Sequence, residues 1–250
     1  MKAMILAAGL GTRLRPLTDN RPKALVEING RTLLEITLSR LRKFGIQQVI
    51  VNVHHFADQV VDYLKKNDSF GMHVEISRED ILLDTGGGLK KAAWFLKAPL
   101  GDSKDSAFIL HNVDVLSTID LDLMLQRHSD DQALATLAVQ ERETSRYLLF
   151  DEQSRLCGRR RGGEQDARNV RPAEETSAWA FCGIHIISTR LLSMMSEDGT
   201  FSIIDTYVRL AAQGEKIVAF RADEYYWRDL GKPESMAQAE NDAKLKIVEP

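Results

Sequence analysis

The sequence predicts an α/β protein in which a mixed, mostly parallel sheet lies between two layers of helices. In the first half of the chain, short apolar segments alternate with segments of helical periodicity, which is typical of parallel strands joined by helices. In the second half, several segments alternate polar and apolar residues and indicate antiparallel strands. No linker separates two domains, so we expect one Rossmann-like three-layer sandwich over residues 1–250.

The elements of the first half follow one another as strand and helix. Strands are expected over 2–8, 48–53, 72–77 and 107–112. Helices are expected over 57–66, over 87–97 before Pro99, and between a capping Thr32 and a terminating Gly45. This order predicts the parallel part of the sheet.

The second half has shorter elements. Strands are expected over 133–140, 146–150, 178–187, 217–220 and 225–227. Helices are expected over 189–196 and 202–213, and a last helix begins at Pro233. Residues 155–172 contain almost no apolar side chain, so we expect an exposed loop there.

Composition excludes several classes of protein. Lys and Arg number 33 and Asp and Glu 36, so a net charge of −3 excludes binding to nucleic acid or to a membrane by bulk charge. No apolar stretch approaches the roughly 20 residues of a membrane span, and the short apolar start is interpreted as a strand rather than a signal peptide. Cys157 and Cys182 lie outside any metal-ligand spacing, so we expect a reducing, cytoplasmic location.

A glycine-rich segment follows the first expected strand. It reads LAAGLGTRLRPLT over residues 6–18, and Pro22 and Lys23 come shortly after it. Glycines directly after a strand let backbone N–H groups approach a phosphate, because no Cβ intervenes. Two arginines and a lysine add positive charge, so the segment suits a triphosphate.

Two other kinds of phosphate loop do not fit this segment. A P-loop requires Gly-Lys followed by Ser or Thr, which is absent. A dinucleotide-binding loop requires a third glycine where this chain has Leu14. It also requires an acidic residue at the end of the second strand, where the chain has Val53 followed by His54 and His55. Either histidine could line a nucleotide site or serve as a hydrogen-bonded structural residue.

The segment resembles the signature of the sugar-phosphate nucleotidylyltransferases, a strand followed by G-x-G-T-R-(L/M)-x-P-L-T and then P-K. The match is complete through Lys23, and weaker resemblance continues to about residue 240. The chain is most similar to short, single-domain members, which include N-acetylmuramate-1-phosphate uridylyltransferases and mannose- or heptose-1-phosphate guanylyltransferases. The resemblance implies the nucleotide-diphospho-sugar transferase type of fold, with a nucleotide-binding half at about 1–130 and a sugar-phosphate-binding half at about 131–250.

The resemblance implies roles for residues of the first half. Arg13 would hold the triphosphate and the departing pyrophosphate, and Lys23 would reach the α-phosphate and the incoming phosphate. The residues implied to bind the nucleotide are Leu6, Ala8, Gly9, Gly11, Thr12, Thr85, Gly86, Gly87 and Asn112. Three glycines over 86–88 before the expected helix would let a base lie against the backbone; the alternative is a flexible start of that helix.

Two aspartates match the metal-binding aspartates of the family. Asp114 follows the strand over 107–112, and Asp229 lies in WRDLGKP over 227–233. Mg²⁺ prefers oxygen ligands and keeps several waters, so one or two carboxylates can hold it. The alternatives are a turn residue for Asp114 and a helix cap for Asp229.

The acceptor site is implied by weaker matches. Gly183 lies in a family strand motif where it would let the sugar approach the backbone, and Glu174 or Glu175 matches a sugar-binding glutamate. Thr176 stands where the family often has a lysine for the sugar phosphate. Arg171 and the other arginines of 155–171 could replace that lysine; the alternative is a solvated loop.

Together these features predict a Mg²⁺-dependent transfer of a nucleoside monophosphate from a nucleoside triphosphate to a sugar 1-phosphate. The three glycines slightly favour UTP over GTP. One alternative is a metal-dependent glycosyltransferase, which usually has a D-x-D motif where this chain reads Asn112-Val113-Asp114. Another is a non-catalytic nucleotide-sugar-binding protein, against which the retention of Lys23 and both aspartates argues.

Overall fold

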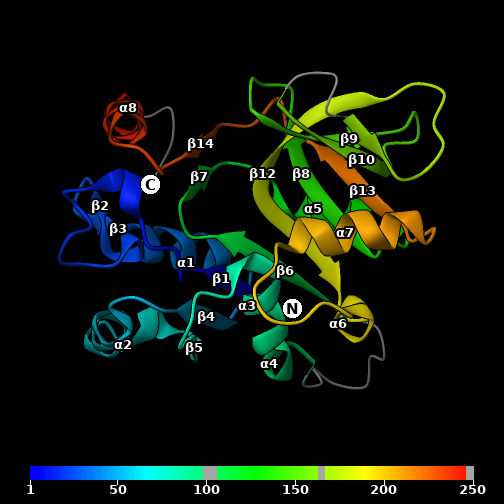
Figure 1. Ribbon diagram of the computed structural model, residues 1–250. Coiled ribbons are helices and arrows are strands. Elements are labelled where there is room, and N and C mark those ends of the chain that lie inside the picture. Colours follow the sequence, from blue (N-terminus) through cyan, green and yellow to red (C-terminus); the bar gives the residue numbers. More distant parts are fainter. Residues whose placement is uncertain (98–105, 163–166, 246–250) are drawn as a thin grey trace.

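The computed structural model describes residues 1–97, 106–162 and 167–245, and it confirms the predicted class (Figure 1). A mixed sheet in the order β11-β10-β9-β12-β6-β1-β4-β5 forms the centre of the molecule, with β8 pairing with both β12 and β13. The pairs among β6, β1, β4 and β5 are parallel, and β12 joins this part antiparallel to β6. The strands from β12 to β11 continue antiparallel.

The strands of the main sheet are β1 Lys2–Leu6, β4 Gln48–Val53, β5 His73–Arg78, β6 Ala107–Asn112, β8 Ala135–Gln140, β9 Arg146–Phe150, β10 Leu156–Arg161, β11 Ala167–Asn169, β12 Ser177–Ser188 and β13 Ile217–Arg221. Two small ribbons are formed by β2 Glu27–Ile28 with β3 Arg31–Thr32, and by β7 Val115–Ser117 with β14 Trp227–Asp229.

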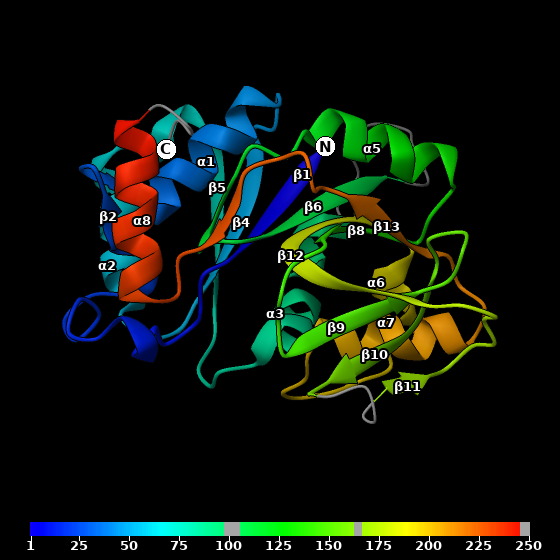
Figure 2. The ribbon, with the colours of Figure 1, turned by 90° about the horizontal axis from the view of Figure 1, so that it is seen from above.

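The helices cover both faces of the sheet, as Figure 2 shows for α5 and α7. The helices of one face are α1 Leu33–Lys43, α2 Ala57–Lys66, α5 Leu121–Asp130 and α8 Pro233–Lys244. Those of the other face are α3 Asp84–Lys91, α4 Ala93–Lys97, α6 Leu191–Met194 and α7 Ile203–Ala212. Each face buries its own apolar core, so the molecule has three layers. Among the described residues, no helix is long and apolar enough to span a membrane.

Local sequence explains where two of these helices begin. The Thr32 hydroxyl accepts a hydrogen bond from the Glu35 N–H at 3.1 Å and caps α1 as predicted. Asp120 caps α5 by accepting from the N–H groups of Asp122 and Leu123. We had no prediction for α5, although this cap and its apolar face are both present in the sequence.

Three expectations for the fold are wrong. Residues 155–172 are not simply an exposed loop, because β10 and β11 lie within this stretch and pair with β9 and with each other. The helix expected over 87–97 is two helices, α3 and α4, and the glycines lie inside α3 rather than before it. The strand expected over 225–227 is β14, two residues later. Pro99 lies outside the described residues.

Candidate active site

A cavity of about 470 Å³ lies at the carboxyl ends of β1 and β6, where the loop after β1 folds over the sheet. Ligands of open α/β sheets bind at this edge. Seven of the nine residues predicted to bind nucleotide line the cavity: Leu6, Ala8, Gly9, Gly11, Thr12, Thr85 and Asn112. Arg13, Lys23 and Asp114 line it as well.

The loop after β1 is held by a few local contacts. Gly11 has a φ of +65°, and a Cβ there would lie 3.0 Å from the Thr18 side chain and 3.1 Å from Lys23. The Thr18 hydroxyl donates to the Gly11 carbonyl at 2.9 Å. Leu14 is fully buried and anchors the loop in the core. Gly11 therefore allows the close approach that brings Lys23 to the cavity, and Leu14 fixes the neighbouring Arg13 at its edge.

Lys23 and Asp114 form an ion pair at the end of β6. Their side chains are only 9% and 17% exposed, so the pair is shielded from solvent. Asp229 lies on the adjacent ribbon, where it pairs with Val115 in the β7–β14 register. The Leu230 N–H donates to the Asp114 carbonyl at 2.8 Å, so the two aspartates are held on neighbouring backbones.

Gly231 makes the approach of Arg13 to Asp229 possible. A Cβ at this position would lie 2.6 Å from both Asp229 Oδ1 and Arg13 Nη2. The Gly231 N–H also donates to Asp229 Oδ1 at 2.9 Å. Gly231 was absent from our prediction, although it is the glycine of the same WRDLGKP segment that identified Asp229.

The donor set at this point suits a hard divalent cation. Asp114, in the turn before β7, and Asp229, on β14, offer carboxylate oxygens from neighbouring segments, and hard cations that keep several waters need only one or two such ligands. Within the described residues, no three His, Cys, Asp or Glu side chains gather as a metal site. The arrangement therefore fits a cation held by two carboxylates and shared with a phosphate-bearing substrate, rather than a closed structural metal centre.

A buried carboxylate that we had not predicted lines the opposite end of the cavity. Glu79 is 4% exposed, and its two oxygens accept from the Asn52 amide at 2.7 Å and from the Leu83 N–H at 2.9 Å. Asn52 in turn accepts from the Ala7 N–H at 2.7 Å. A Cβ on Gly88 would lie 2.7 Å from both Asn52 Nδ2 and Glu79 Oε1. Only a glycine at this position therefore leaves space for the Asn52–Glu79 hydrogen bond.

Gly86 and Gly87 do not line the cavity. They pack α3 against the segment before α7: a Cβ on Gly86 would meet the Phe201 ring at 2.3 Å, and one on Gly87 would meet the Gly199 carbonyl at 2.4 Å. Thr85 does line the cavity, and its hydroxyl accepts from the Ile203 N–H at 3.0 Å. The glycines therefore allow the helix packing that positions Thr85.

A second cavity of about 540 Å³ adjoins the first and shares Arg13 and Asn112 with it. Asp229, Lys232 and Gly183 line it on the side of the shared residues. Gly183 has a φ of +74°, and a Cβ there would lie 2.8 Å from the Asn112 amide nitrogen. The glycine is therefore required by the close passage of β12 against β6 at the junction of the two cavities.

Arg142 crosses the second cavity and was absent from our prediction. Its guanidinium lies 3.9 Å from the centre of the Trp227 ring and donates to the Phe181 carbonyl at 2.7 Å. Burial lowers the pKa of Arg142, while the neighbouring Cys182 and Asp229 oppose this fall. The Trp227 ring is itself fixed, because its N–H donates to the Cys182 carbonyl at 2.7 Å.

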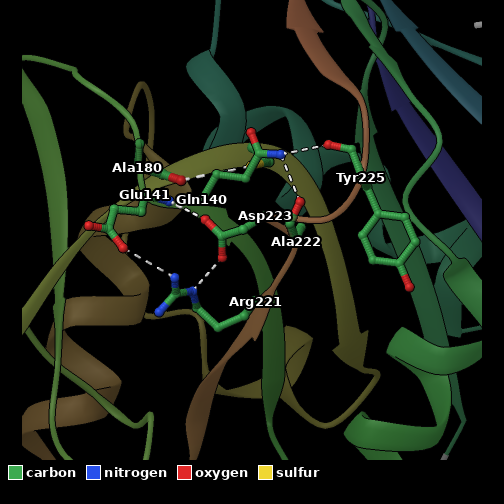
Figure 3. Close-up of polar contacts among 8 residues, drawn as sticks. Gln140, Glu141, Ala180, Arg221, Ala222, Asp223 and Tyr225 are labelled. Carbon is green, nitrogen blue, oxygen red and sulfur yellow. Dashed lines mark hydrogen bonds and ion pairs between the residues drawn. The ribbon is translucent and has the colours of Figure 1, made fainter. Parts of the chain in front are cut away.

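A polar network fixes the two chain segments that carry Arg142 and Trp227 (Figure 3). The Gln140 amide donates to the carbonyls of Ala222 at 2.7 Å and Tyr225 at 3.0 Å, across the turn after β13. The Glu141 N–H donates to Asp223 at 2.7 Å. These bonds join the end of β8, just before Arg142, to the turn that leads into β14.

The remaining predicted residues lie elsewhere. Glu174 and Glu175 are exposed, and the Glu175 N–H donates to the Glu152 carboxylate at 2.8 Å, beyond the end of β9. Arg171 lies beside β10, where its N–H approaches the Cys157 carbonyl. None of these three lines either cavity. Their predicted contact with the sugar phosphate stays a prediction.

The two histidines after β4 also lie outside both cavities. His54 Nδ1 lies 2.8 Å from the Glu79 carbonyl, and the His55 ring contacts the Phe56 ring. His54 thus has the structural role that we had left open.

Comparisons with known proteins relate the whole chain to one family. The model of the nucleotidyl transferase family matches residues 2–245. N-acetylmuramate alpha-1-phosphate uridylyltransferase of Caulobacter vibrioides is 34% identical, over 95% of each chain. D-glycero-alpha-D-manno-heptose 1-phosphate guanylyltransferase of Aneurinibacillus thermoaerophilus is 28% identical, over 99% of this chain and all of the relative. The fold is similar to that of HddC from Yersinia pseudotuberculosis complexed with GMP-PN, with a TM-score of 0.75, 24% identity and coverage of 96% of this chain and 98% of that one.

Proposed function

This chain belongs to the nucleotidyl transferase family, and we propose that it transfers a nucleoside monophosphate from a nucleoside triphosphate to a sugar 1-phosphate. The products are a nucleotide sugar and pyrophosphate. The observation that carries the proposal is the junction of two cavities at Arg13 and Asn112, beside Lys23, Asp114 and Asp229. One cavity would hold the nucleotide and the other the acceptor, with the reacting phosphates at the junction.

The reaction requires alignment and charge neutralisation rather than a general base. An oxygen of the acceptor phosphate is already an anion when it attacks the α-phosphorus, and the bond to the pyrophosphate oxygen breaks as the new bond forms. Arg13, which lines both cavities, would stabilise the leaving pyrophosphate. Lys23 would turn from Asp114 to the α-phosphate and the incoming oxygen, because a flexible ammonium can move between such partners.

Asp114 and Asp229 would hold the metal ion, for which we propose Mg²⁺ because both ligands are hard carboxylate oxygens. When bound, the ion neutralises charge on the triphosphate. Lys23 neutralises Asp114 in this structure, so Asp114 would hold a cation only once Lys23 has turned to the substrate phosphates. The two aspartates therefore connect cation binding to the position of the catalytic lysine.

The nucleotide that we propose is UTP. The relative that is 34% identical is a uridylyltransferase, whereas the heptose relative that transfers guanylate is 28% identical. Gly86 and Gly87 do not line the cavity, so these glycines do not support the choice of UTP over GTP. Glu79, Asn52 and Thr85 would instead form the base-binding end of the first cavity. We also propose the cytoplasm as the location, since both cysteines are free, buried thiols.

The decisive experiment combines each of four nucleoside triphosphates with a set of sugar 1-phosphates and measures pyrophosphate release with Mg²⁺ present. We expect release only when both substrates are present, and most with UTP. A metal-dependent glycosyltransferase would instead consume a finished nucleotide sugar without releasing pyrophosphate. A non-catalytic binding protein would bind the nucleotide and release nothing; either outcome would overturn the proposal.

A further inference from the structure

The second cavity carries far more positive charge than one phosphate requires. Its lining contains one acidic side chain, Asp229, and seven basic ones: Arg13, Arg142, Arg146, Arg159, Arg160, Arg161 and Lys232. The whole chain has a net charge of −3, so this surplus is local. Such a concentration of arginines in a concave site is typical of a site for anions.

The basic residues fall into two groups along the cavity. Arg13 and Lys232 lie with Asp229 at the junction with the nucleotide cavity, whereas three consecutive arginines over 159–161 lie on β10. Two strands, β12 and β9, separate β10 from β6, which carries Asn112 at the junction. At about 4.8 Å per strand, the backbones of β6 and β10 lie roughly 14 Å apart across the sheet. A single phosphate at the junction would not occupy both groups.

The strand register places like charges opposite one another beside β10. Arg161 is the direct partner of Arg146 on β9, and Arg159 is the direct partner of Arg168 on β11. Because Arg159 and Arg161 are two residues apart on one strand, all four side chains share one face of the sheet. Like charges directly opposite one another destabilise a pair of strands. An anion between them would remove this cost.

Within the described residues, few acidic side chains neutralise this charge. Arg159 pairs with Asp205 at the start of α7. Arg160 lies 4.5 Å from the centre of the Tyr147 ring, and its Nε is buried with no hydrogen-bond partner in the described part of the chain. Across residues 1–97, 106–162 and 167–245, no carboxylate forms an ion pair with Arg146, Arg160 or Arg161. In the part of the chain that the structure describes, these three guanidinium groups therefore have no acidic partner.

We propose that the sugar acceptor carries a second anionic group in addition to its 1-phosphate, and that Arg146 and Arg161 bind this group. The inference rests on the proposed function, since it places the 1-phosphate at the junction with the nucleotide cavity. A carboxylate and a second phosphate share the required chemistry, because arginine binds both through paired N–H groups. The substrate class is thus an acidic or doubly phosphorylated sugar 1-phosphate rather than a neutral one.

The test compares acceptors that differ in this one group. Glucose 1-phosphate is compared with glucuronic acid 1-phosphate and with glucose 1,6-bisphosphate, and N-acetylglucosamine 1-phosphate with N-acetylmuramic acid 1-phosphate. We expect kcat/KM to be at least about ten-fold higher for an acidic acceptor than for its neutral counterpart, because hydrogen bonds to charged groups are the stronger ones. The carboxylate and bisphosphate probes distinguish the two sources of the charge.

Variants of the cavity arginines then test whether these residues cause the preference for acidic acceptors. Arg146→Gln and Arg161→Gln should each lower the ratio of kcat/KM for acidic over neutral acceptors by about ten-fold, and Arg161→Lys should restore part of it. Arg127→Gln on α5 removes the same charge from a residue paired with Asp131, away from both cavities, and should leave the ratio unchanged. The melting temperature of Arg161→Gln should be equal to or above that of the parent, because a like-charge pair is relieved.

Each outcome decides the inference. Equal kcat/KM for acidic and neutral acceptors would overturn it while leaving the proposed function intact. A preference that survives Arg146→Gln and Arg161→Gln would overturn the assignment to these arginines. Absence of pyrophosphate release with every nucleotide and acceptor would overturn the proposed function and this inference together.

Discussion

Replacement of Lys23 by methionine separates the catalytic role of this residue from its structural one. Methionine keeps much of the length and packing of the side chain but removes the charge. Lys23 is paired with Asp114, and both side chains are largely shielded from water. The loss of one preorganised charge from a reaction centre typically costs about 10²- to 10³-fold in rate, which is roughly 3–4 kcal/mol.

The same substitution leaves the Asp114 carboxylate without its ion-pair partner. An unsatisfied and largely buried group of this kind costs about 1–3 kcal/mol in the free energy of unfolding. If Asp114 is a metal ligand, Mg²⁺ should return most of this stability by supplying another positive charge beside the carboxylate. Mg²⁺ should not restore the rate, because the variant still lacks the ammonium that reaches the α-phosphate.

The measurements are pyrophosphate release and the melting temperature, each with and without Mg²⁺. Lys66→Met on the exposed face of α2 is the matched control, since it removes the same charge far from both cavities. Folded Lys23→Met with a turnover within a few-fold of the parent would refute the role of Lys23. Mg²⁺ should raise the melting temperature of Lys23→Met more than that of Asp114→Asn. An equal rise in the two variants would refute the proposed exchange between Lys23 and the cation at Asp114.

Three further predictions concern the metal, acid stability and helix packing. Asp114→Asn and Asp229→Asn should each raise the Mg²⁺ concentration needed for half-maximal rate, and a chelator should stop turnover reversibly; an unchanged rate after chelation would contradict the two-aspartate site. Burial lowers the pKa of His111 to about 4 and of His185 to about 3. Both are neutral in the folded chain and take up protons more readily when unfolded. Each histidine should therefore lower the free energy of unfolding by about 2 kcal/mol between pH 7 and pH 5. Denaturant titration at the two pH values would measure this loss, and equal stability at both would contradict it. Gly87→Ala should lower the melting temperature and raise the KM for the nucleotide, because its Cβ would press on the Gly199 carbonyl at 2.4 Å; an unchanged protein would contradict the packing role.

The loop after β1 and the position of Asp114 could be predicted because their signals are local. The loop after β1 takes its shape from consecutive residues, with a glycine at positive φ and a buried leucine. Asp114 directly follows a buried strand, so the end of that strand places it at the ligand edge of the sheet. Such short-range patterns can be read from the sequence because the same few residues determine both the path of the backbone and the position of the site residues.

The glycines over 86–88 show that a local pattern does not by itself identify the group that approaches the backbone. Glycine indicates that something approaches the backbone closely, but it does not say what approaches. In this chain the approaching groups are Phe201, the Gly199 carbonyl and the Asn52–Glu79 pair. The first two lie more than 100 residues away in the sequence, and their contact with α3 depends on packing that periodicity does not report.

The lining of the second cavity depends on strand register, which the sequence did not reveal. The arginines over 159–161 predicted an exposed loop because no apolar alternation marks β10, whose pairing with β9 rests on backbone hydrogen bonds and on the Arg160–Tyr147 contact. Only that register shows that Arg161 faces Arg146, and a shift by one residue would have turned these side chains to opposite faces. The register that pairs Arg161 with Arg146 is therefore the observation that the prediction of a loop lacked, and the proposed anion site depends on it.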